Sequence, residues 1–247
     1  MKTFLVVALF IAASSAVRLP VLKTKNHDLI EGDMIIPPEV REILRNQDSR
    51  NGVTNLWLRW PEATIHYLFD GVSASNQALI VQSLAKVEEA TCMRFIQGVN
   101  SEGNYVRVTD NEEGCWSYVG YLHKPGQQLN IGYGCEWEGT IIHEFLHAAG
   151  FQHQQCSYER DDFVELFLEN VEPDMRFNFD KYTEAEVTNF GTRYDYDSIM
   201  HYDAYAFSMN GKKVMVPKLL PEGENMGLAE ELSPTDIYKI EAMYNCH

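Results

Sequence analysis

The chain has 247 residues, 45% of them hydrophobic, and a formal net charge of −16 at pH 7. That length suits one good-sized domain or two small ones, and the hydrophobic content is sufficient for a packed core. A strongly acidic chain lacks the clustered Lys and Arg that bind phosphate groups. Nucleic acids and anionic membrane surfaces are therefore excluded as partners, and the acidity is best interpreted as a soluble surface.

The first sixteen residues have the layout of a signal peptide. A basic start at Met1-Lys2 precedes an apolar run over residues 4–13, and small residues follow at 14–16. The alternative, a membrane anchor, needs about 20 apolar residues, which this run and all later segments lack. We therefore expect residues 1–16 to be removed, the protein to be secreted, and no membrane anchor to be present.

Secretion determines how the cysteines are interpreted. In an oxidising compartment five cysteines should form pairs and leave one over. None of the spacings is C-x-x-C, so a zinc site made of cysteines is not expected. The five cysteines are Cys92, Cys115, Cys135, Cys156 and Cys246.

The first half of the chain predicts a sheet with helices. Residues 17–50 are polar and poorly periodic, as in a pro-segment. Alternation over residues 63–69 predicts a strand, and helical spacing of apolar residues follows over 73–90. Further strands are expected at 105–109 and 129–133. A second helix is expected at 139–149, ended by Gly150.

The second half is rich in loops and closes with a helix. Ser233 is a capping residue, Pro234 suits the first helical position, and Asp236 supplies an acid at the third. The fold class is therefore α+β, with a sheet-and-helix half followed by an irregular half.

The most informative segment is the run from His143 to His153. His143 and His147 are four residues apart on one helical face and can bind one metal ion together. Glu144 can reach a water on that ion, and the turn at Gly150 returns His153 to it. Three imidazoles leave a coordination position open, as catalytic zinc requires, although copper or nickel would bind in a test tube. The alternative is an accidental pair of surface histidines.

A second signal, Ser198-Ile199-Met200-His201-Tyr202, would mean little alone, because a Met among aromatics is usually core. Downstream of three histidines it resembles the Met-turn of metzincins. Together with the residues that lead into His143 and follow Gly150, it makes residues 51–246 resemble the astacin family of zinc endopeptidases. Short arthropod members, such as insect seminal metalloproteases, are the most similar.

The resemblance implies a two-lobed metzincin domain that holds one Zn²⁺ per chain. It assigns the zinc ligands to His143, His147 and His153, and the general base to Glu144. Tyr202 matches a tyrosine that ligates zinc in the resting enzyme and hydrogen-bonds the oxyanion during catalysis. Without the resemblance, Tyr202 would be interpreted as a packing residue.

The resemblance also pairs the cysteines. It implies the disulfides Cys92–Cys246 and Cys115–Cys135, which leaves Cys156 without a partner.

The pro-segment contains a related motif, Ile30-Glu31-Gly32-Asp33-Met34. Asp33 matches the aspartate that blocks the metal in astacin precursors. Alignment to the family places the activating cut after Arg50, with Arg45 as the alternative, so a trypsin-like protease is the expected activator. The resulting division is signal peptide 1–16, propeptide 17–50 and catalytic domain 51–247.

Two positions depart from the family pattern. Relatives usually carry Glu after the third His, and the buried amine of the mature N-terminus meets it. Here that residue is Gln154, and Ser157 stands where Arg is usual. These changes spare the metal and the base but put the anchoring of the new N-terminus in doubt.

The function hypothesis is a secreted zinc endopeptidase, made as a zymogen and active as a monomer on protein or peptide substrates. The substrate is expected to lie extended along an edge strand near residues 129–133. Two rivals are a structural or binding protein that keeps the fold, and a metallo-oxidase, which gives no reason for Glu144. Digestion, hatching, venom and reproduction all stay open as the physiological role, as does the cleavage-site preference.

Overall fold

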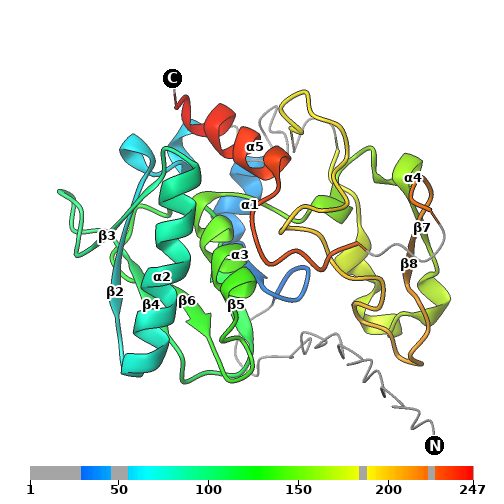
Figure 1. The fold of residues 1–247 in the computed structure, drawn as a ribbon, viewed down its shortest axis with the longest axis horizontal. Coiled ribbons are helices and arrows are strands. Elements are labelled where there is room, and N and C mark those ends of the chain that lie inside the picture. Colours follow the sequence, from blue (N-terminus) through cyan, green and yellow to red (C-terminus); the bar gives the residue numbers. More distant parts are fainter. Residues whose placement is uncertain (1–28, 46–54, 184–187, 222–225, 247) are drawn as a thin grey trace, which may run out of the picture.

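The computed structural model describes residues 29–45, 55–183, 188–221 and 226–246 (Figure 1). The expected signal peptide and the Arg50 cleavage site lie outside these ranges. Five α-helices are present in the described residues: α1 (Pro38–Arg45), α2 (Ala74–Ala90), α3 (Glu138–Ala149), α4 (Arg160–Phe163) and α5 (Pro234–Tyr244). Short 3₁₀ helices lie at Leu56–Leu58, Pro61–Ala63, Gln154–Cys156, Leu168–Asn170 and Pro173–Phe179.

The eight described strands form two sheets, a large one and a small one. The strands are β1 (Met34–Ile35), β2 (Thr64–Phe69), β3 (Arg94–Gln97), β4 (Val106–Thr109), β5 (Cys115–Tyr118), β6 (Gln127–Ile131), β7 (Val164–Leu166) and β8 (Met215–Pro217). The large sheet has the order β1-β5-β6-β4-β2-β3, and β7 pairs with β8. Within the large sheet, β5 and β6 are antiparallel and the other pairs are parallel.

The first half of the chain packs α2 and α3 against the large sheet. The N-terminus of α2 is capped by Ser73, whose side chain accepts a hydrogen bond from the amide of Asn76. In β2, Ile65 and Tyr67 alternate inward and are buried. The helix α3 is buried along most of its length between α2 and strands β5 and β6. This packing fixes the position of the helix that carries His143 and His147.

The second half is largely irregular and has its own buried cluster. That cluster includes Val164, Phe179, Tyr194 and Val214. Figure 1 shows this half beside the sheet half, while α5 returns to the sheet half. Ile240 and Met243 of α5 join the core of the first half. The α+β architecture with two dissimilar halves, expected from the sequence, is confirmed.

Most expected elements are present, but one inference about the sheet is wrong. The strands near 63–69, 105–109 and 129–133 correspond to β2, β4 and β6, and the three helices to α2, α3 and α5. However, β6 lies between β5 and β4, so it offers no edge to a substrate. The other neighbour of β5 is β1 of the N-terminal segment, which forms that end of the sheet, so without this segment β5 would be the edge strand. No described helix is long and apolar enough to cross a membrane.

Candidate metal centre and active site

The helix α3 presents two histidines and a glutamate toward one point. His143 and His147 are one turn apart, and the helix ends at Gly150, which adopts the left-handed conformation (φ 107°). Only glycine takes up this conformation without strain, and it lets the chain reverse directly after the helix. The reversal returns His153 to the same point, as the sequence predicted.

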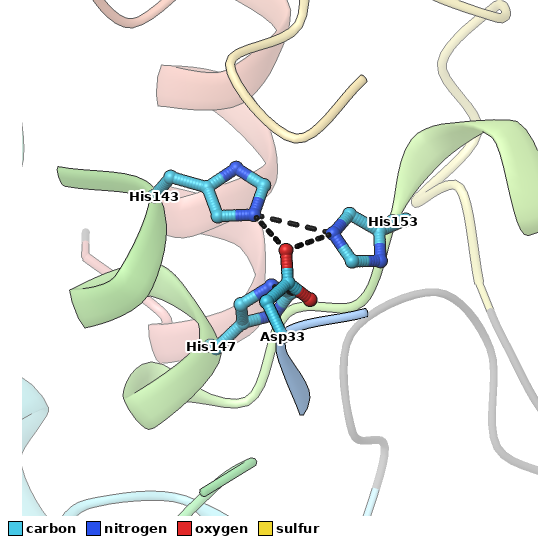
Figure 2. A group of neighbouring side chains, drawn as sticks. All are labelled: Asp33, His143, His147 and His153. Carbon is cyan, nitrogen blue, oxygen red and sulfur yellow. Dashed lines mark hydrogen bonds and ion pairs between the residues drawn. The ribbon is translucent and has the colours of Figure 1, made fainter. Parts of the chain in front are cut away.

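The three imidazole rings converge on the carboxylate of Asp33 (Figure 2). Oδ2 of Asp33 lies 3.4 Å from Nε2 of His143 and 3.2 Å from Nε2 of His153. Oδ1 lies 3.5 Å from Nε2 of His147. The donor atoms of all four residues lie within 4.8 Å of one another, which makes the group a candidate metal site.

The outer nitrogen of each ring is held by a separate acceptor. Nδ1 of His143 donates to the carbonyl of Ile199 (2.8 Å), and Nδ1 of His147 donates to the carbonyl of Phe151 (2.7 Å). Nδ1 of His153 donates to Oε2 of Glu31 (2.8 Å). All three tautomers therefore direct Nε2 toward the common centre, as metal-binding imidazoles require.

Burial and the neighbouring charges change the pKa values of these groups. Burial lowers the pKa of His147 to about 4. Burial also acts to lower the pKa of His153, but the charges of Asp33 and Glu31 outweigh it and raise that pKa to about 9. Burial opposes ionisation of Asp33 as well, yet the surrounding histidines hold its pKa well below the usual value. The negative charge of Asp33 is thus compensated chiefly by positive charge on His153.

Glu144 and Tyr202 border the same centre. Both line a cavity of about 140 Å³ together with His143 and Asp33. Glu144 is buried, and this burial, followed by the charge of Asp33, raises the pKa of its carboxyl group well above the usual value. The ring of Tyr202 lies 4.4 Å from the ring of His153, centre to centre, and burial raises the pKa of its hydroxyl group.

The family model described as Astacin (Peptidase family M12A) matches residues 52–245. The chain belongs to the astacin family. The match covers the histidines, Glu144 and the turn that follows them, but it does not include the N-terminal segment with Asp33.

Individual astacin relatives agree with this assignment. The zinc metalloproteinase nas-15 of Caenorhabditis elegans is 36% identical over 197 residues, which are 79% of this chain and 34% of the relative. Meprin A subunit beta of Mus musculus is 31% identical over 219 residues, 89% of this chain and 30% of the relative. The chain spans 32 to 52% of the length of the first four curated relatives. The arthropod seminal subtype stays a prediction.

Two solved structures share the fold. High choriolytic enzyme 1, a hatching enzyme zinc-protease from Oryzias latipes, has a TM-score of 0.69 and 33% identity, covering 76% of this chain and 94% of the other. Myroilysin, at 21% identity and a TM-score of 0.57, supports the fold alone.

Astacins depend on zinc, and the donor set of this chain fits that ion. Three imidazole nitrogens with one further open position are the ligands of a catalytic zinc site. Within the described residues, the buried Nε2 of His147 and Oε2 of Glu144 have no hydrogen-bond partner. Buried polar atoms are rarely left this way, so a metal ion and its water would satisfy both groups.

The segment from Ser198 to Tyr202, which was expected to be a Met-turn, contacts the site through its backbone. Met200 is buried in the main core, and its carbonyl accepts a hydrogen bond from the amide of Gln154 (2.9 Å). The neighbouring carbonyl of Ile199 is the one that orients His143. The turn therefore fixes the positions of the first and third histidines at once.

The cysteines are paired as the resemblance to astacins implied. Disulfides join Cys92 to Cys246 and Cys115 to Cys135. Cys156 is a free, buried thiol whose Sγ lies 3.4 Å from the carbonyl of Asn178. Burial raises the pKa of this thiol well above its usual value, so it is held in the unreactive protonated form.

Sequence reasoning missed three residues that support the site. Glu31 holds His153, Gln155 accepts a hydrogen bond from the amide of Tyr202 (3.1 Å), and Asp236 accepts one from the amide of Ile199 (2.9 Å). Asp236 was predicted only as a helix-capping residue. Glu31 belongs to the pro-segment motif Ile30-Glu31-Gly32-Asp33-Met34, but a role was assigned there to Asp33 alone.

Proposed function

We propose that this chain is a secreted zinc-dependent endopeptidase made as an inactive precursor. The observation that carries the proposal is the convergence of three Nε2 atoms on one point beside a buried carboxylate, Glu144. Membership of the astacin family supports the same activity. The substrates are proteins or peptides of the extracellular space.

His143, His147 and His153 are the proposed zinc ligands. Zinc bound there would supply a Lewis acid that polarises the scissile carbonyl and acidifies a water molecule. Glu144 takes a proton from that water and delivers it to the leaving amine. Tyr202 donates a hydrogen bond to the oxyanion.

The N-terminal segment would keep the precursor inactive. Asp33 lies where a zinc ion and its water would be, since its oxygens are 3.2 to 3.5 Å from all three Nε2 atoms. A carboxylate at this point can take the open coordination position. The backbone of the same segment occupies β5: the amide of Ser117 donates to the carbonyl of Asp33 (2.8 Å), and that of Val119 to Ile35 (3.2 Å).

The substrate is expected to replace the segment on β5. An extended peptide can add to a free strand edge through main-chain hydrogen bonds. Removal of residues 17–50 by a trypsin-like cut after Arg50 would free both this edge and the metal. We expect the mature chain to act as a monomer.

A single set of measurements tests the proposal. The precursor is treated with trypsin and assayed on an internally quenched peptide library, with and without a zinc chelator. We expect activity after cleavage only, loss of it with chelator, and recovery with added Zn²⁺. Glu144→Ala should keep one zinc per chain and lose about 10²-fold or more of the activity. The exposed Glu89→Ala on α2 is the control. Normal turnover by Glu144→Ala, or activity that survives the chelator, would contradict the proposal.

A further inference from the structure

The three candidate zinc ligands differ in which part of the chain supplies the hydrogen-bond acceptor for Nδ1. His143 and His147 donate from Nδ1 to carbonyls of Ile199 and Phe151, which belong to the proposed catalytic domain. His153 instead donates to Glu31, which lies 122 residues earlier in the chain, in the N-terminal segment. Cleavage after Arg50 would leave the partners of two histidines in place and remove the partner of the third.

Glu31 is held in a defined position rather than resting on the surface. It is 3% exposed. Its Oε1 accepts a hydrogen bond from the hydroxyl group of Tyr182, and its amide donates to Oδ1 of Asn178 (2.9 Å). Its backbone adopts φ 51°, a left-handed conformation that is costly for a residue other than glycine. The packing around the carboxylate therefore stabilises a conformation that the residue would otherwise avoid.

A tight turn brings Glu31 and Asp33 to opposite sides of one ring. Ile30 and Met34 exchange backbone hydrogen bonds of 2.8 and 3.0 Å and close the turn between them. Asp33 then faces Nε2 of His153 and Glu31 faces Nδ1. A single three-residue turn thus supplies one carboxylate to the metal side of the ligand and another to its outer side.

We propose that Glu31 is a positioning residue for the zinc ligand His153, present in the precursor and lost on maturation, and that it tightens zinc binding by the precursor. This inference rests on the proposed zinc site and the proposed removal of the N-terminal segment. A carboxylate on the outer nitrogen fixes the tautomer and orientation of a metal-binding imidazole and makes it a more basic ligand. Loss of such a partner typically weakens metal affinity 10- to 100-fold.

A purely structural role for Glu31 makes a different prediction. If Glu31 served only to dock the turn, its loss would release Asp33 and separate the whole segment from β5. The amides of Ser117 and Val119 report this docking, because they donate to carbonyls of the segment. Their hydrogen exchange can be followed without any assay of activity.

The test compares full-length precursors that carry Glu31→Gln or Glu39→Gln. Both substitutions remove one negative charge from the N-terminal segment, but Glu39 is exposed on α1 and distant from the histidines in sequence. Zinc dissociation constants are measured by competition with a chromogenic chelator at neutral pH. Hydrogen exchange at Ser117 and Val119 is measured on the same samples by NMR.

We expect Glu31→Gln to weaken zinc binding 10- to 100-fold with Ser117 and Val119 still protected, and Glu39→Gln to match the parent. A dissociation constant unchanged by Glu31→Gln would overturn the proposal. Weakened binding together with loss of protection would also overturn it, since Glu31 would then act only by docking the segment. None of these outcomes depends on peptidase activity, so a failure of the proposed function would be seen separately.

Discussion

The side chains of Lys239 and Gln154 meet in the protein interior, where Nζ of Lys239 donates a hydrogen bond to Oε1 of Gln154. Lys239 belongs to α5 and is 5% exposed, while Gln154 directly follows the third histidine and is 2% exposed. Burial lowers the pKa of Lys239, and the charges of Asp236, Asp195 and Glu159 act against this effect. The amine of Lys239 therefore already lies beside the residue that replaces the usual glutamate of the family.

This pair leads to a prediction about the mature N-terminus. The resemblance to astacins implies that the new α-amino group meets a glutamate at the position of Gln154. Here the new ammonium group would be buried beside the amine of Lys239 and a neutral amide in place of a carboxylate, which is electrostatically costly. We expect mature enzyme beginning at Asn51 and versions one or two residues longer to have kcat/KM values within about threefold of each other, a difference of less than 1 kcal/mol.

The comparison is made with purified proteins whose N-termini are checked by mass spectrometry. Gln154→Glu is an informative second background, because it restores an acid but leaves Lys239 in place to pair with it. A large loss of activity from one extra residue in the parent chain would show that the buried amine arrangement survives beside Lys239.

The second prediction concerns Asp33 in the precursor. Asp33→Ala removes the carboxylate that faces all three histidines but leaves the backbone hydrogen bonds to β5. We expect this precursor to have partial peptidase activity before any cleavage, because the metal is open while the segment still hinders the substrate. The assay is peptide hydrolysis by uncleaved protein, with Glu39→Ala as the control.

An inactive Asp33→Ala precursor would contradict the proposed role of Asp33. If Asp33→Ala is as inactive as the parent precursor and both gain equal activity after trypsin, the segment blocks by steric cover alone. The role of Asp33 as the zymogen switch would then be wrong.

The elements that were predicted correctly are marked by sequence patterns within or next to the element itself. The helices α2 and α5 begin at Ser73 and Ser233, whose side chains cap the first turn, and α3 ends at Gly150. Periodicity and capping involve residues within a few positions, so a sequence alone reveals them. The sequence does not reveal the pairing of β1 with β5, because a strand as short as Met34–Ile35 has no periodic pattern and its partner lies far along the chain.

The candidate site also combines residues close in the sequence, which could be predicted, with distant ones, which could not. His143, Glu144, His147 and His153 lie within eleven residues, and the geometry of one helix and one turn brings them together. Glu31 reaches His153 across 122 positions, a contact that tertiary packing creates. The wrong assignment of the edge strand has the same cause: the order of strands in the sheet is a property of the whole fold.

The third prediction concerns Asp236, which links α5 to the Met-turn. Its carboxylate accepts hydrogen bonds from Oγ of Ser198 (2.6 Å) and from the amides of Ile199 (2.9 Å) and Ser233 (3.1 Å). Asp236→Asn replaces one accepting oxygen by an amide group that faces donors. We expect the free energy of unfolding to fall by about 1–3 kcal/mol, since a buried donor loses its partner.

Urea unfolding of the disulfide-intact protein measures this change. Asp197→Asn, at an exposed position directly before Ser198, serves as the control. Because Ile199 orients His143, the zinc affinity of Asp236→Asn should fall as well. Unchanged stability would mean that neither the first turn of α5 nor the segment around Ile199 depends on this carboxylate.

The last prediction is a pH dependence of stability that comes from His201. This side chain is 5% exposed, with Nδ1 at 2.7 Å from the carbonyl of Tyr202 and Nε2 at 2.7 Å from the hydroxyl group of Tyr194. Both nitrogens of the neutral ring are therefore satisfied. Burial lowers the pKa of His201 to about 4; the carbonyl of Tyr202 and the charge of Asp195 act to raise it, while His153 and Lys239 act to lower it.

The folded and unfolded pKa values of His201 determine whether stability rises or falls with pH. In the unfolded chain the pKa of histidine is about 6.5, so between pH 6.5 and 4 the unfolded state binds more protons than the folded state. The stabilisation is therefore complete above pH 6.5 and is lost as the pH falls toward 4. A difference of about 2.5 pKa units corresponds to about 3 kcal/mol.

We expect the metal-free parent to lose about 2–3 kcal/mol more stability between pH 7 and pH 4.5 than His201→Gln loses. Urea unfolding of both proteins at the two pH values gives this difference from the midpoints and m values, and the contributions of groups that do not interact with His201 cancel in it. Equal losses in the two proteins would show that His201 is not held in the neutral form by its surroundings.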